Sequence, residues 1–166
     1  ILSGARHITI AGHIVYITTP TALVILDLDD PLSPKLVKRI KMEDPRASAV
    51  QFRYLFVTDQ DGLKIFDATS PLNIVSSPVA SIALNDAKKV YVARTYAYVA
   101  AGKDGLAIIN VKNPEKPSVY KMFTANGKLN DAQDVIVGST NASLFAYVAD
   151  GKNGLKVIQL TAPDTQ

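Results

Sequence analysis

A short strand–turn–strand unit recurs along this chain, and it constrains the fold more than any other feature. The clearest copy runs from Phe145 to Ile158, where alternating aromatic and small residues are followed by an apolar run rich in Leu, Val and Ile. Between the two halves stands Asn153-Gly154, a pair that tolerates the positive φ angles of a two-residue hairpin turn. Similar segments occupy residues 96–109 and 55–67, and a less regular one occupies residues 15–27. Each copy therefore predicts a β-hairpin.

The hairpins belong to longer repeats, at residues 5–46, 47–86, 87–131 and 132–163. Successive units start 42, 40 and 45 residues apart. A period near 40 with only strand signals is typical of the four-stranded blades of a propeller. No stretch of ten residues keeps the apolar spacing of a helix, so no helix longer than two turns is expected. The sequence predicts a single all-β domain, a β-propeller of four blades of about 42 residues each.

Within a unit, a short alternating strand precedes the hairpin, and a proline-rich corner and a charged outer strand follow it. The outer strands are expected at residues 36–41, 79–83 and 119–123, where lysine discourages edge-to-edge pairing. The fourth unit shows no outer strand, so the edge of residues 155–160 is expected to be unpaired. Two architectures remain open: a closed four-bladed ring, or an arc of a larger propeller. Gly62, Gly105 and Gly154 are predicted at equivalent turns with positive φ.

Composition restricts the function classes. Apolar residues make up 48% of the chain and charged residues 20%, as in an ordinary globular domain. The net charge is +3, and the basic residues are dispersed, so no nucleic-acid partner is expected. The chain has no cysteine, which excludes disulfides, thiol catalysis and cysteine-bound zinc for this sequence. No apolar run reaches the length of a membrane span, so no direct membrane insertion is expected.

The repeated segments resemble the LVIVD repeat. The resemblance rests on Gly-Leu-Lys-Ile-Phe-Asp at 62–67, Gly-Leu-Lys-Val-Ile at 154–158, Leu-Val-Ile-Leu-Asp at 23–27 and the corner Asn-Pro-Glu-Lys-Pro at 113–117. It covers nearly the whole chain and implies a β-propeller from a secreted, cell-surface or periplasmic protein. It implies no catalytic residues. Asn110 and Gln159 stand where the first units carry Asp27 and Asp67, which argues against a shared acidic ring.

These observations favour a non-enzymatic protein-binding or scaffold module, whose partners are other protein domains or copies of itself. One alternative is a domain of a longer electron-transfer or adhesion protein whose chemistry lies outside this chain. Another is a propeller hydrolase or a quinoprotein-type enzyme. No nucleophile elbow, phosphate-binding glycine loop or acid–histidine pair is present in the sequence. No catalytic residue, cofactor or metal is assigned.

Two patterns in the sequence resemble parts of metal sites. Asp59-Gln60-Asp61-Gly62 resembles the start of a calcium loop, but it lacks the later carboxylates that a full loop needs. His7 and His13 are the only histidines and have no third ligand of the same kind, which argues against zinc or haem iron. Turn chemistry explains the first pattern, and a half-buried or exposed imidazole explains the second.

In a propeller, the loops that enter the innermost strands and the hairpins that follow the second strands lie on one face. Loops grouped on a rigid scaffold are frequent binding surfaces. On that face the sequence gathers a set of charged residues, which form the candidate binding face: Asp44, Arg46, Asp59, Asp61, Asp86, Lys88, Lys103, Asp104, Asp131, Asp134, Asp150 and Lys152.

Overall fold

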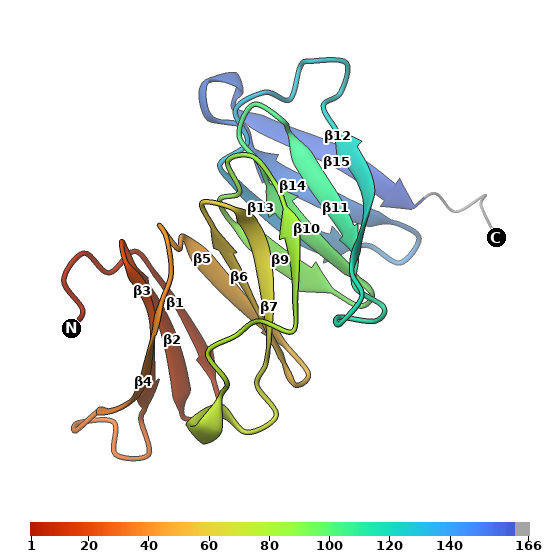
Figure 1. The fold of residues 1–166 in the computed structure, drawn as a ribbon. Helices are drawn as coiled ribbons and strands as arrows, with labels where there is room; N and C mark the ends of the chain where they lie inside the picture. Colours follow the sequence, from red (N-terminus) through yellow and green to blue (C-terminus); the bar gives the residue numbers. More distant parts are fainter. Residues whose placement is uncertain (162–166) are drawn as a thin grey trace.

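The computed structural model describes residues 1–161 and arranges them in four antiparallel sheets (Figure 1). Three sheets have four strands, and the last has three. In chain order the strands are β1 (His7–Ala11), β2 (Ile14–Thr19), β3 (Ala22–Asp27), β4 (Lys35–Lys41), β5 (Ala47–Gln51), β6 (Tyr54–Asp59), β7 (Gly62–Asp67), β8 (Ala80–Ala83), β9 (Val90–Ala93), β10 (Tyr96–Ala100), β11 (Leu106–Asn110), β12 (Ser118–Phe123), β13 (Asp134–Ser139), β14 (Leu144–Ala149) and β15 (Leu155–Thr161).

Within each sheet the strands follow one another in sequence order. The helical elements of the described residues are two short 3-10 turns, η1 (Pro71–Asn73) and η2 (Gly151–Asn153). The prediction that no helix exceeds two turns is confirmed. The all-β prediction is also confirmed, because the other regular elements are all strands. Neither 3-10 turn approaches the length of a membrane-spanning helix, and no such helix occurs among residues 1–161.

The four sheets form an open arc. The innermost strands pack in sequence, β1 against β5, β5 against β9, and β9 against β13. Figure 1 shows the first sheet at one end of the molecule and the last sheet at the other. Of the two architectures that the sequence left open, the structure has the arc.

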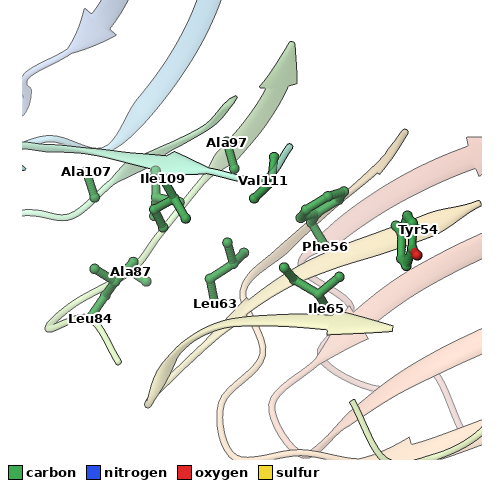
Figure 2. Close-up of a cluster of buried hydrophobic side chains, with 11 residues drawn as sticks. Tyr54, Phe56, Leu63, Ile65, Leu84, Ala87, Ala97, Ala107, Ile109 and Val111 are labelled. Atoms are coloured by element: carbon green, nitrogen blue, oxygen red, sulfur yellow. The ribbon is translucent and has the colours of Figure 1, made fainter. Parts of the chain in front are cut away.

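Alternation along the second strand of each sheet explains how the sheets stack. Successive side chains of a strand point to opposite faces. In β6, Phe56 faces the third sheet and joins a cluster with Ala97 and Ile109, whereas Val57 faces the first sheet and packs with Tyr16. Figure 2 shows the first of these clusters, between the second and third sheets. Each sheet thus presents one apolar face forward and one backward along the arc.

The hairpin turns differ more than their sequences suggest. Gly62, Gly105 and Gly154 all have positive φ, at 138°, 79° and 77°. A two-residue turn joins Asp59 to Gly62. The prediction of a two-residue turn at Asn153-Gly154 is wrong: Ala149 pairs with Leu155, and residues 150–154 form a longer loop around η2. The side chain of Asp150 organises that loop, because its carboxylate accepts hydrogen bonds from within it and from residue 131.

Candidate functional site

The candidate binding face lies where the connectors between sheets meet the hairpins of the preceding sheets. The amide of Asp44 donates to the carbonyl of Pro20 at 3.2 Å, and the amide of Gly102 donates to the carbonyl of Ala132 at 3.0 Å. These bonds place connector and hairpin residues at the same edge of the sheets. The connectors that carry residues of the candidate binding face therefore lie beside the hairpins of neighbouring sheets.

A chain of ion pairs runs along this edge. Arg6 pairs with Asp44, and Arg46 contacts Asp44 at 3.0 Å and Asp86 at 3.3 Å. Lys88 lies 3.8 Å from Asp86 and continues the chain. The hydrogen bond from Arg6 lowers the pKa of Asp44. Sequence analysis missed Arg6, although it precedes β1 as Arg46 precedes β5. These charges already have partners within the chain.

Asp59 and Asp150 do not reach the surface, since both are fully buried. Asp59 pairs with Lys64 and accepts the amide of Asp61 at 2.9 Å. Asp150 accepts the amide of Asp131 at 2.8 Å and the side-chain amide of Asn153 at 3.0 Å. Buried carboxylates need such donors. The structure uses both residues to hold hairpins, so neither can contact a partner directly.

The remaining members of the face are less connected. Asp104 accepts the side-chain amide of Asn85 at 3.3 Å. The backbone amide of Lys152 donates to Asp131, and this bond lowers the pKa of Asp131. Lys103 and Asp134 are exposed. This face is a polar rim, and most of its groups bind one another.

The calcium-like hairpin is occupied by an ammonium group. Lys64 contacts the carboxylates of both Asp59 and Asp61. Burial opposes the charged form of Lys64, but the hydrogen bonds to the two carboxylates outweigh burial and raise the pKa of Lys64. In the described part of the chain, no group of three or more histidine, aspartate or glutamate side chains gathers as metal ligands do.

His7 lies on the inner strand of the first sheet, and its Nδ1 accepts the amide of Ser48 at 3.3 Å. Burial lowers the pKa of His7, the charge of Lys89 lowers it further, and Asp134 partly opposes both effects. The unfolded chain therefore binds this proton more readily than the folded one. The stability that His7 contributes is complete above the ordinary histidine value of 6.5. It is lost as the pH falls through the folded pKa.

We expect the melting temperature to fall more between pH 7.5 and pH 5.5 in the wild type than in His7→Asn. The asparagine oxygen can accept the Ser48 amide, but it does not titrate in this range. Thermal melts followed by circular dichroism at the two pH values measure the difference. Equal losses in the two proteins would contradict a depressed His7 pKa.

Sequence analysis did not find the groove beside β15. Within the described residues β15 pairs only with β14, so its other edge is open, as predicted. Between this edge and β12 lies a groove of about 420 Å³, which continues into a second hollow of about 360 Å³. Its apolar lining comes from both sheets and includes Ile108, Tyr120, Phe123, Val157, Ile158 and Leu160. Tyr120 borders both hollows and packs on Tyr96 at 5.4 Å between ring centroids.

Solved structures of similar shape support the fold. The computationally designed Ika8 protein matches with a TM-score of 0.67 at 9% identity, over 94% of this chain and 46% of that chain. A functionally unknown protein from Desulfotomaculum acetoxidans matches with a TM-score of 0.65 at 11% identity, over 95% and 55%. Hsv2 of Kluyveromyces lactis matches with a TM-score of 0.55 at 16% identity, over 98% and 47%. The chain spans about half the length of each of these three proteins.

At such low identities the likeness concerns the fold alone. No curated protein is detectably similar to this sequence. The family model for the LVIVD repeat matches residues 4–41, 85–124 and 131–163. The second sheet falls outside these matches, although it has the same four-stranded order as the first and third. Since the matched segments cover most of the chain and each contains one sheet of the arc, the chain belongs to the LVIVD-repeat family of β-propellers.

Proposed function

We propose that this chain is a non-enzymatic protein-binding module, a propeller scaffold that accepts an extended strand from a protein partner. The observation that carries the proposal is the open edge of β15 beside an apolar groove. An exposed strand edge offers unpaired amides and carbonyls, and adjacent pockets select the side chains of the added strand. We further propose a secreted, cell-surface or periplasmic location, which rests on the resemblance to the LVIVD repeat.

The other sheets indicate what fits this edge. In the third sheet, Leu106 of β11 pairs with Phe123 of the outer strand β12. β15 has the same pattern as β11, with Leu155 at the place of Leu106. A strand with alternating apolar residues, similar to β12, therefore matches both the backbone edge and the groove of the last sheet.

The test uses a fluorescent peptide that copies residues 117–124, which include β12, and measures its binding by anisotropy. A peptide with alternate backbone amides methylated is the control, since it keeps the side chains but cannot form the ladder. We expect saturable binding of the first peptide only. Equal binding of both peptides, or of neither, would count against strand addition.

Matched substitutions locate the peptide. Tyr120→Ala removes a wall of the groove and an aromatic contact worth about 1 kcal/mol, so the affinity should fall roughly five-fold. Val119→Ala is the control, because Val119 is on the same strand and exposed but does not line the groove. If Val119→Ala weakens binding as much as Tyr120→Ala, the peptide binds elsewhere.

A further inference from the structure

The two ends of the arc carry complementary halves of one interface. Inside the molecule, the forward face of each sheet packs on the backward face of the next. Leu23, Leu63 and Leu106 hold equivalent places on forward faces, and each is 0% exposed. Leu155 holds the same place in the last sheet and is 65% exposed. The last sheet therefore shows an interface residue with nothing on it among the described residues.

Neighbouring positions repeat the contrast. Ile25 and Ile65 are 0% exposed, whereas Val157 at the equivalent place is 56% exposed. Ile136 of β13 lies beside Tyr147 on the same face and is 57% exposed. A contiguous apolar face of this kind marks a contact surface.

The first sheet shows the opposite half. Ile8 and Ile10 of β1 lie on the backward face, beside Ile17 and Val15. Ile8 and Ile10 are 59% and 61% exposed, whereas Ile17 and Val15 on the next strand are 8% and 2% exposed. Val135, which is equivalent to Ile8 in the last sheet, packs against the third sheet and is 2% exposed. The first sheet is therefore built to follow another sheet.

The N-terminal segment supports this independently. The amide of Arg6 donates to the carbonyl of Thr18 as the amide of Arg46 donates to that of Thr58, so residues 2–6 correspond to the connector at residues 42–46. Met42 lies in the core between the first and second sheets and is 6% exposed. Leu2, at the equivalent place, is 38% exposed. Gly4 has positive φ, as Asp44 does.

We infer that two copies of this chain close head to tail into a ring of eight blades. The forward face of the last sheet in each copy packs on the backward face of the first sheet in the other. Leu2 of one copy then lies beside Leu155 of its partner, as Met42 packs in one cluster with Leu23. The open arc aligns with 46% of the Ika8 chain with a TM-score of 0.67. The rest of that chain is long enough for a second arc of the same length. The occupant of both faces is a second copy, because the chain itself carries both halves of the interface.

The ring joins the two end faces, whereas the proposed strand binding uses the groove at the outer edge of β15. Val157 borders the groove as well as the end face, but Ile10 and Leu155 do not line the groove. Each idea can therefore fail while the other stands.

Sedimentation of the full chain tests the ring. The monomer has a mass of 17.8 kDa, so the ring has 35.6 kDa. We expect the 35.6 kDa species in the wild type. Ile10→Asp on one end face and Leu155→Lys on the other should each weaken association at least ten-fold. Leu32→Asp is the matched control, since Leu32 is 97% exposed in a loop, and it should leave association unchanged.

Mixing the two end-face variants gives the decisive result. In the mixed pair one junction keeps both wild-type faces, and the other brings the new carboxylate and the new ammonium together. The mixture should therefore recover the 35.6 kDa species that each variant alone lacks. If Ile10→Asp or Leu155→Lys lowers the melting temperature, Ile8→Asp and Ile136→Lys replace them.

Three outcomes with the separate proteins overturn the ring. They are a monomeric wild type at every concentration, a wild-type assembly of another size, and a single-face variant that still dimerises alone. The last would indicate that two identical faces pair with each other. A mixture that recovers nothing is equally incompatible with head-to-tail closure.

Discussion

Replacing Phe56 by alanine is expected to lower the free energy of unfolding by about 3–5 kcal/mol. Phe56 is 1% exposed and fills the space between the second and third sheets, where it packs in one cluster with Leu63 and Ile109 (Figure 2). Small residues face it across the gap, so the surroundings cannot collapse to fill the cavity. Chemical denaturation at low protein concentration measures the change.

Tyr147→Ala is the matched control for this cavity. Tyr147 pairs with Val157 as Phe56 pairs with Ile65, so the two aromatic residues hold equivalent places in their sheets. Tyr147 is only partly buried, because no described sheet follows its own. Its replacement should cost the isolated chain about 1 kcal/mol or less. Equal losses at the two positions would show that the last sheet is covered within a single chain.

Replacing Gly105 by alanine should lower the free energy of unfolding by about 2–5 kcal/mol. Gly105 has φ of 79°, and a Cβ atom there would meet the carbonyl oxygen of Phe123 at 2.2 Å. That oxygen belongs to the backbone of the adjacent outer strand, so it can move only if the sheet shifts. Thermal and denaturant unfolding would both report the loss.

Gly154→Ala separates the two causes. Gly154 has nearly the same φ, 77°, but a Cβ atom there meets nothing within 4 Å. Its replacement costs only the strain of a backbone conformation with φ of 77° and ψ of −138°, which favours glycine, about 1–3 kcal/mol. The difference between the two variants is therefore the cost of the close approach to β12. If both variants lose the same stability, the outer strand lies farther from the turn than the structure places it.

The sequence by itself determined the repeating sheets. Alternation such as Tyr96 to Ala100, the glycines with positive φ and the charged outer strands are local signals, because side-chain direction and turn geometry depend on neighbours in the chain. The same signals predicted the open edge of β15, and within residues 1–161 no strand other than β14 pairs with β15. The topology of the repeats also predicted that the connector and hairpin charges lie at one edge of the sheets.

The tertiary structure alone decided which of these residues face water. Asp59 and Asp61 lie in the same turn, yet only Asp59 is buried. Leu106 and Leu155 both follow a glycine at the start of a strand, but Leu106 is buried and Leu155 is exposed. The groove at Tyr120 likewise depends on the distance between two sheets that are separate in sequence. Burial and ion pairing depend on how one sheet stacks on another. The angle between stacked sheets determines whether the described chain forms a ring or an arc. No local pattern encodes it, because every repeat carries both faces of the same interface.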